Sequence, residues 1–310
     1  MRPSARSGQR GAALLMAMVI VTLVATLASA MVWQQWRAVQ VEAAERGRMQ
    51  AAWILAGALD WARLILREDK RDVDSLDDIW ANPLAEARLS TFLAADKNNT
   101  DDAPEAFLSG SITDAQARYN LRNLFDEKTG KVVPAELAVL KRLCDTAGVA
   151  ADVAERLASA LAAASTGSGD APLMPQTVSQ LTWLGLDADT VHRLAVHVVL
   201  LPARTPVNLN TASREVIAAA IAGVELGDAE RLVQVRQRTP FKNLDEAKAN
   251  LPASVVLNER QVAVNSRYFE VRGQLRLDDR VLQERSLVER RNPEIVTVQR
   301  ERVNLNDPGS

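Results

Sequence analysis

The sequence predicts an α+β fold in which a long N-terminal helix packs on a small antiparallel sheet and a large helical domain is inserted into the head. Three observations lead to this prediction. Residues 12–33 are uncharged, and the apolar pattern continues in helical spacing to about Glu68. Residues 134–238 repeat a helix–turn–helix pattern. After Asn250 the apolar residues recur at every second position, as in strands.

Residues 12–33 are long enough to span a membrane. At a rise of about 1.5 Å per residue they form about 33 Å of helix, and a bilayer core is roughly 30 Å thick. The leader before them carries Arg2, Arg6 and Arg10 and no acidic residue. Because positive charge is retained on the cytoplasmic side, we expect the residues from 34 onward to lie outside the cytoplasm.

Three interpretations of this N-terminal region remain open. Residues 27–30 (Leu-Ala-Ser-Ala) offer a site for a cleaved secretory signal, although the apolar run exceeds the roughly 7–15 residues usual for such a signal. The segment can also be a plain membrane anchor, or it can follow a prepilin-like leader cut after Gly11. The helix that continues beyond the membrane favours the third interpretation. Its expected packing stripe, spaced by three and four, is Ala51, Ile54, Ala58, Trp61 and Ile65.

Composition excludes several kinds of site. The 37 basic and 39 acidic residues give a net charge of −2, so the chain has no general attraction for nucleic acid. Cys144 is the single cysteine, which excludes an intrachain disulfide and a cysteine-based metal cluster. His192 and His197 are five residues apart, unlike the i, i+4 pairs that bind metals on helices. Catalytic motifs such as G-x-S-x-G, H-E-x-x-H and the Walker loop are missing, so we expect no enzyme activity.

Three helix–turn–helix units are expected in the middle of the chain. The first pairs residues 134–146 with 151–164, the second pairs 177–184 with 188–200, and the third pairs 212–222 with 228–238. Asn210 or Thr211 is expected to cap the helix that opens the third unit.

Three strands are expected at the C-terminal end. Residues 269–277 alternate, with Gly273 interrupting the apolar face, and residues 281–290 and 295–303 follow as strand candidates. Residues 107–120 also have a β-like pattern. The three C-terminal strands predict an antiparallel meander, and the long N-terminal helix is available to cover one of its faces.

These patterns predict the domain organisation. The segments are a leader at 1–11, a membrane helix at 12–33, a helix with the first part of the head at 34–125, an inserted helical domain at 126–255, and C-terminal strands of the head at 256–310.

The sharpest local signal is Thr205–Ser213, which resembles a helix-hairpin-helix module that presents backbone N–H groups to DNA phosphates. Here Gly223 and Gly227 are separated by three residues, and Glu225 between them would repel a phosphate. We therefore expect a structural motif and no nucleic acid. The motif residues are Asn208, Asn210, Thr211 and Ala212. A membrane-anchored DNA-binding protein of competence type is the alternative function.

Residues 96–102 have carboxylates at alternate positions, as in a calcium loop. The segment lacks the glycine at position six and the glutamate at position twelve of such a loop. We expect a solvated turn there and assign no metal ligand.

Together these features resemble the type II secretion system protein K family of minor pseudopilins. The resemblance is carried by the junction at Gly11, by Ala117–Leu121 and Thr205–Ala212, and by Ser266–Phe269. Most pilins have glutamate at the fifth position after the cut, where this chain has Met16. The protein K family, which this sequence resembles, also lacks the glutamate at that position.

The resemblance implies that a prepilin peptidase removes residues 1–11 and methylates Ala12. It also implies that one helix spans the inner membrane and that a pilin-like head lies in the periplasm. At the tip of the pseudopilus the chain would join minor pseudopilins I and J, and the inner-membrane assembly platform is a further expected partner. Its role would be to support the initiation of pseudopilus assembly and the export of folded proteins across the outer membrane.

No cofactor is expected, with calcium as an alternative because the resemblance links calcium to the family's head. The acidic stretch that often precedes the second helical unit in the family is replaced here by residues 162–169, Ala-Ala-Ala-Ser-Thr-Gly-Ser-Gly.

Overall fold

The computed structural model describes residues 9–69, 72–89, 106–167, 171–277, 280–291 and 293–303. The chain forms two compact units, Met1–Ile54 and Leu55–Ser310, and each is described by itself. The turn predicted at 96–102 lies outside the described residues.

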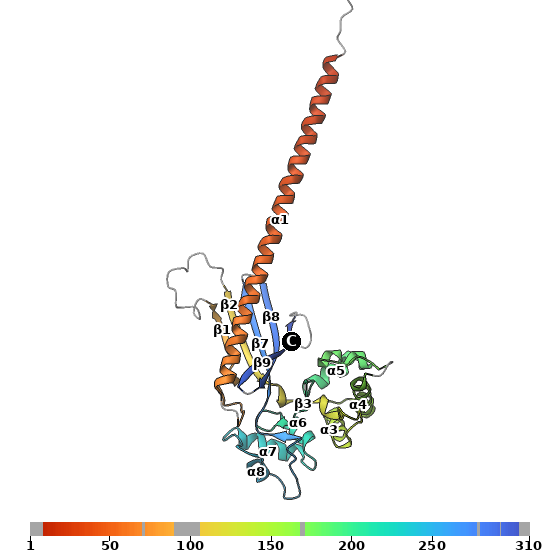
Figure 1. Ribbon diagram of the computed structural model, residues 1–310, viewed down its shortest axis with the longest axis vertical. Helices are drawn as coiled ribbons and strands as arrows, with labels where there is room; N and C mark the ends of the chain where they lie inside the picture. Colours follow the sequence, from red (N-terminus) through yellow and green to blue (C-terminus); the bar gives the residue numbers. More distant parts are fainter. Residues whose placement is uncertain are drawn as a thin grey trace, which may run out of the picture. The chain divides into compact units, whose positions relative to one another are not determined.

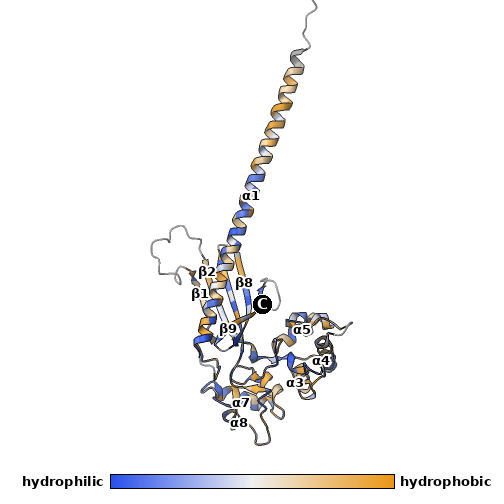
Figure 2. Cartoon of the chain, in the orientation of Figure 1, coloured by the Kyte–Doolittle hydropathy of each residue, from blue (hydrophilic) through white to orange (hydrophobic). Residues whose placement is uncertain are grey.

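Helix α1 (Gln9–Glu68) begins with the apolar segment and ends where the predicted helix ends. A window of 18 residues within it has a mean hydropathy of 2.4, so the helix is long and apolar enough to cross a membrane. Figure 2 shows its first half as mostly hydrophobic and the turns that follow as more hydrophilic. Length and composition therefore fit the predicted membrane helix at 12–33.

The head of the second unit contains a five-stranded antiparallel sheet in the order β1-β2-β7-β8-β9. The three C-terminal strands form the predicted meander. The β-like segment before Asn120 supplies β2, which pairs with β7 along its whole length. The strands are β1 (Leu84–Arg88), β2 (Ala106–Asp114), β7 (Tyr268–Leu277), β8 (Arg280–Arg291) and β9 (Glu294–Val303).

The last turns of α1 cover one face of this sheet (Figure 1). The expected packing stripe is confirmed at Ala51, which is buried, but its later positions were wrong by one residue. Leu59, Ala62 and Leu66 are buried, whereas Ile65 is half-buried and Trp61 is 49% exposed. Both stripes have the same spacing of three and four, so the position of the sheet decides which one is covered. The buried cluster also contains Trp80, Ile112, Phe269, Val271, Val288 and Ile295.

Two paired glycines, Gly110 and Gly273, lie side by side on β2 and β7. A Cβ at Gly110 would lie 2.8 Å from the backbone oxygen of Arg272, and one at Gly273 would lie 3.3 Å from Cδ2 of Leu55. Glycine therefore lets neighbouring strands, and the helix above them, approach closely.

We expect Gly110→Ala to lower the free energy of unfolding by about 1–3 kcal/mol, because the added methyl group forces the strands apart. Gly57→Ala is the matched control on α1, where nothing lies within 4 Å of a built Cβ. It should raise the free energy of unfolding by roughly 0.5–1 kcal/mol, because alanine is the better helix former. Urea unfolding of the purified chain in detergent measures both, and equal effects of the two variants would contradict the prediction.

The helical part of the second unit has its own core, which runs from Tyr119 to Val264 and so includes residues on both sides of the segment 126–255. The domain boundaries at 126 and 255 stay a prediction. The helices are α3 (Pro134–Thr146), α4 (Ala151–Thr166), α5 (Ala188–Ala195), α6 (Arg214–Ala220), α7 (Leu226–Arg236) and α8 (Leu244–Lys248). Short 3-10 helices are η1 (Ile79–Ala81), η2 (Ala115–Ala117), η3 (Leu121–Leu124) and η4 (Val178–Leu184).

The second helical unit differs from the expected pattern. In place of the helix expected at 177–184, residues 178–184 form the 3-10 helix η4, and the helix predicted to reach Leu200 ends at Ala195. The β-branched residues after it form β4 (Val198–Val199), which pairs in parallel with β3 (Tyr119–Asn120) and buries both valines. A second short parallel pair joins β5 (Val207–Asn208) to β6 (Val262–Ala263). The first pair joins the helical part to β3, which follows β2 of the sheet, and the second joins it to β6, which precedes β7.

Candidate functional site

Asp114, at the end of β2, is the central acceptor of a buried polar cluster between the sheet and the helical part. Its Oδ2 accepts hydrogen bonds from Asn208 Nδ2 at 2.9 Å, Thr211 Oγ1 at 2.6 Å and Ser266 Oγ at 2.7 Å. Its Oδ1 accepts the backbone N–H of Gln116 at 2.8 Å, which starts η2. Burial raises the pKa of Asp114, although these four donors act in the opposite direction.

Asn208 is fully buried and uses both ends of its amide. Its Nδ2 also lies 3.0 Å from the backbone oxygen of Asp74 and 3.0 Å from Ser266 Oγ. Its Oδ1 accepts the backbone N–H of Asn210 at 2.9 Å. The β5–β6 pairing fixes the backbone at Asn208, so that one side chain connects the loop after α1, the loop before β7 and the start of the third helical unit.

Asn210 holds a second loop in place. Its side chain donates to the backbone oxygen of Phe241 at 2.9 Å and accepts the N–H of the same residue at 2.9 Å. Arg236, which is buried, donates to the backbone oxygen of Leu209. Burial lowers the pKa of Arg236 to about 10. This arginine therefore serves the interior of the fold.

The expected helix cap was wrong. Ser213 caps α6, accepting the N–H of Val216, whereas Asn210 and Thr211 are drawn into the buried cluster. Ala212 is fully buried in the helical core. The chain needs two residues after Thr211 to leave the cluster before the helix can begin.

Two further asparagines hold the loop before β5. Asn120 donates to the backbone oxygen of Ala203 at 2.7 Å and to Thr205 Oγ1 at 3.0 Å. Asn123 forms a pair with the backbone of Thr205, donating to its oxygen at 2.8 Å and accepting its N–H at 3.1 Å. The segment Ala117–Leu121, which carried part of the sequence resemblance, thus anchors the same junction.

Asp74 and Arg290 form a buried ion pair beside this cluster. Arg290 Nη1 lies 2.9 Å and 3.1 Å from the two carboxylate oxygens of Asp74, and the N–H of Ser266 donates to Oδ2 at 2.7 Å. Asp74 is fully buried. Burial raises the pKa of Asp74 to about 7, although Arg290 and the Ser266 N–H favour the charged form.

This raised pKa predicts a dependence of stability on pH. A carboxyl group whose pKa is higher in the folded state than its ordinary value of 3.8 binds its proton more tightly when folded. Its contribution to the free energy of unfolding is complete below about pH 3.8 and is lost as the pH rises through about 7. In the wild-type chain this loss lowers the free energy of unfolding by on the order of a few kcal/mol between about pH 3.8 and about pH 7. We expect the variant Asp74→Asn to lack this decrease.

Urea unfolding at several pH values measures the difference between the wild-type chain and Asp74→Asn. The matched control is Asp77→Asn, at an exposed position three residues away, which should keep the wild-type pH dependence. A parallel pH dependence of the wild-type chain and Asp74→Asn would contradict the prediction.

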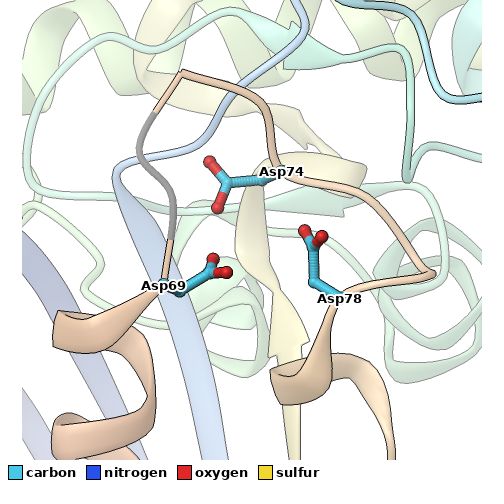
Figure 3. Close-up of side chains that lie close together, drawn as sticks. All are labelled: Asp69, Asp74 and Asp78. Atoms are coloured by element: carbon cyan, nitrogen blue, oxygen red, sulfur yellow. The ribbon is translucent and has the colours of Figure 1, made fainter.

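Three carboxylates converge where α1 ends, and they do not fit a calcium site. Oxygens of Asp69, Asp74 and Asp78 lie within 4.8 Å of one another (Figure 3). Arg290 contacts two of the three, with Nη2 at 3.3 Å from Asp69 Oδ2, and the N–H of Ser75 donates to Asp78 Oδ2 at 2.6 Å. The guanidinium thus already supplies the positive charge that a bound cation would bring.

The hairpin of the third helical unit is not arranged to bind phosphate. Gly223 has a φ of +78°, as a tight turn requires. Asp228 accepts the N–H of Glu225 and pairs with Arg231 at 3.3 Å, so an acidic side chain already binds the start of α7. Arg236 is buried. These contacts disfavour the DNA-binding alternative.

The residues predicted at the leader junction are placed on α1. Gly11 and Ala12 lie in its first turns, and Met16 is 69% exposed. The predicted motif residues Asn208, Asn210, Thr211 and Ala212 lie together in the other unit. The partners that complete their cluster, Asp74, Asp114 and Arg290, were missed, because each of these charged residues is ordinary in its local sequence.

The cluster holds segments together, and its acid and hydroxyl groups are all engaged with one another. Asp114, Thr211 and Ser266 form a closed set of hydrogen bonds with Asn208. Such an arrangement positions the helical part on the sheet.

Comparisons with known proteins agree with this architecture. The family model described as "Type II secretion system (T2SS), protein K" matches residues 207–265, which contain the asparagine motif. Type II secretion system protein K of Pseudomonas aeruginosa is 29% identical over 305 residues, which cover 89% of this chain and 87% of that protein. The protein of the same name from Klebsiella pneumoniae is 29% identical over 326 residues, covering 94% and 96%.

A solved structure has the same fold. The crystal structure of the GspK-GspI-GspJ complex from the enterotoxigenic Escherichia coli type 2 secretion system contains a chain that matches with a TM-score of 0.62 and 20% identity. The match covers 84% of this chain and 98% of that chain. The predicted α+β fold, with a long N-terminal helix and an antiparallel sheet, is thereby confirmed.

Proposed function

We propose that this chain is a member of the type II secretion system protein K family and acts as a minor pseudopilin at the tip of the secretion pseudopilus. The observation that carries the proposal is the likeness to the Pseudomonas aeruginosa protein over 89% of this chain. In this role the chain supports the initiation of pseudopilus assembly and the export of folded proteins from the periplasm across the outer membrane.

The place at the tip is supported by the side chain at position 16. In most pilins a glutamate at the fifth position of the mature chain neutralises the N-terminal amine of a neighbouring subunit within the membrane. An unpaired charge there is costly, because the surroundings have a low dielectric constant. Met16 provides no carboxylate, so this chain has nothing to offer a subunit in that position. A subunit at the tip has no following neighbour whose N-terminal amine it must neutralise.

The helical part also suits a terminal position. It adds α3 to α8 to the pseudopilin head, and the buried cluster around Asp114 fixes it to the sheet. We propose that this bulk prevents another subunit from following. The partners in the tip are minor pseudopilins I and J, and the solved complex named after GspK, GspI and GspJ supports this choice. The inner-membrane assembly platform is a further proposed partner.

The apolar start of α1 fits a membrane anchor. We propose that it spans the inner membrane once, with the arginine-containing leader in the cytoplasm and the head in the periplasm. A prepilin peptidase cuts after Gly11 and methylates Ala12. The family is one of structural secretion proteins, and the proposed role uses neither catalysis nor a bound cofactor.

Mass spectrometry of the membrane-extracted chain tests this function directly. The mature chain should begin at N-methylated Ala12 and co-purify with shorter pseudopilins. We expect Gly11→Val to keep Met1 and to abolish secretion, because a branched side chain before the cut blocks the peptidase. Gly8→Val, three residues upstream, is the matched control and should be processed normally.

Two results would overturn the proposal. A chain that begins at Met31 would be a secreted protein cut by signal peptidase after Ala30. A mature chain that retains Met1, or that never co-purifies with shorter pseudopilins, would be a plain membrane-anchored protein.

A further inference from the structure

A polar pocket of about 340 Å³ lies beside the junction of the sheet and the helical part. Its lining includes Gln116 from η2, Thr205 from the loop before β5, and three arginines, Arg204, Arg267 and Arg290. No acidic residue lines it among the described residues. The volume is several times the roughly 30 Å³ that one water molecule occupies in the liquid.

Arg204 brings a further positive charge to this pocket. It is exposed and makes no hydrogen bond or ion pair with any residue that the structure describes. The other two arginines have acidic partners: Arg267 Nε lies 3.2 Å from Glu289 Oε1, and Arg290 pairs with Asp74. Hydrogen bonds from Thr129 and, as a smaller effect, the nearby charge of Arg204 lower the pKa of Asp126. Within the described residues Arg204 thus has an acidic neighbour but no direct ion pair.

Arg290 also leaves one buried donor without an acceptor. Its Nη1 and Nη2 bond to Asp74 and Asp69, whereas its Nε is buried and has no hydrogen-bond partner among the described residues. The Arg290 side chain is 6% exposed. Buried polar groups in native proteins are nearly always satisfied, and an orphaned one indicates a bound water or ion.

Further donors are available in the same pocket. Arg267 pairs through Nε with Glu289 and donates from Nη2 to the hydroxyl of Tyr268 at 2.9 Å. Among the described residues its Nη1 has no hydrogen-bond acceptor, so the N–H groups of Nη1 can bind a ligand. Thr205 Oγ1 accepts a hydrogen bond from Asn120, which leaves its hydroxyl proton to donate. A guanidinium fork is matched best by the oxygens of a carboxylate or phosphate.

We propose that this pocket binds one small oxyanion, a phosphate or a carboxylate, through Arg204, Arg267 and Arg290. An oxyanion supplies an acceptor for the buried Nε of Arg290 and a negative charge that can pair directly with Arg204. A water molecule supplies the acceptor alone. Because the pocket is built from η2, the loop before β5, the loop before β7 and β8, a bound anion joins the sheet to the helical part. This inference does not depend on the proposed function.

Thermal unfolding of the full chain in detergent tests the proposal. Sodium phosphate and sodium acetate are each compared with sodium chloride at equal ionic strength. We expect phosphate, acetate or both to raise the melting temperature in a saturable manner, because a ligand that binds the folded state stabilises it. A response to phosphate alone assigns a tetrahedral oxyanion, and a response to acetate alone assigns a carboxylate.

The variant Arg204→Gln should weaken the apparent affinity for the anion at least about tenfold, because it removes a charge-assisted bond. Arg238→Gln removes an exposed arginine from the end of the third helical unit, outside the pocket lining, and should bind as the wild-type chain does. Isothermal titration of phosphate or acetate into the three proteins gives the affinities without reference to stability.

Two results overturn the proposal. If neither anion binds or raises the melting temperature beyond chloride, the pocket holds only water. If both variants lose affinity equally, the anion acts through general charge screening.

Discussion

Asp114→Ala is expected to lower the free energy of unfolding by about 3–5 kcal/mol, one of the two largest effects we predict for this chain. The substitution removes the acceptor of Asn208, Thr211 and Ser266, and their donors lie in a region closed to solvent. Each buried donor left without an acceptor costs about 1–3 kcal/mol, part of which is regained because the buried carboxylate is no longer desolvated. Urea unfolding of the purified chain in detergent measures the change.

Asp145→Ala is the control for this prediction. Asp145 is exposed on α3, so its removal should change the free energy of unfolding by less than about 0.5 kcal/mol. Asp114→Asn keeps one acceptor oxygen and should fall between the two. An Asp114→Ala chain as stable as the Asp145→Ala chain would show that the cluster does not hold the junction together.

Leu66→Ala is expected to cost about 2–5 kcal/mol, because it opens a cavity between α1 and the sheet. Leu66 is fully buried, in a cluster with Trp80, Phe269 and Val288. The neighbouring strands and helix are held by their own hydrogen bonds and can close only part of the cavity. The loss should therefore exceed the transfer free energy of the removed methyl and methylene groups.

Leu64→Ala is the matched control, with the same chemical change two residues earlier on α1. Leu64 is 43% exposed, so we expect a cost of less than about 1 kcal/mol. Because Leu64 and Leu66 have equal helix propensity, the difference reports burial alone. Equal costs for the two variants would mean that α1 covers the sheet with a different stripe.

These two contacts have different roles in the proposed tip subunit. The stripe that contains Leu66 joins α1 to the sheet. The cluster around Asp114 joins the sheet to the helical part. We expect a weakened cluster to loosen the helical part before the sheet unfolds, and so to impair a cap at the tip.

Several elements followed directly from the sequence. The helix at 134–146 was predicted with its observed bounds, because Pro134 starts it and Gly148 follows its end. The alternation after Asn250 predicted the meander, and the long apolar stretch predicted α1. These features are local: the spacing of apolar residues, a proline or a glycine decides them.

Other elements depended on distant partners. Val198 and Val199 continue a helical pattern, yet they pair with Tyr119 and Asn120 as a short strand. Asn210 and Thr211 are good helix caps by composition, but buried partners far along the chain recruit them. In both cases a tertiary contact outweighed a local preference. The preference is a fraction of a kcal/mol per residue for helix propensity and about 1 kcal/mol for a helix cap.

The sequence by itself determined that this chain carries an apolar N-terminal helix, helix pairs and a C-terminal meander, and its motifs resemble those of the type II secretion system protein K family. Only the tertiary structure decided which stripe of α1 is buried and which acids meet the asparagines. Asn208 meets Asp114 across 94 positions and Asp74 across 134. Periodicity specifies the faces of an element, whereas the partner of each face depends on how segments far apart in the sequence come together in space.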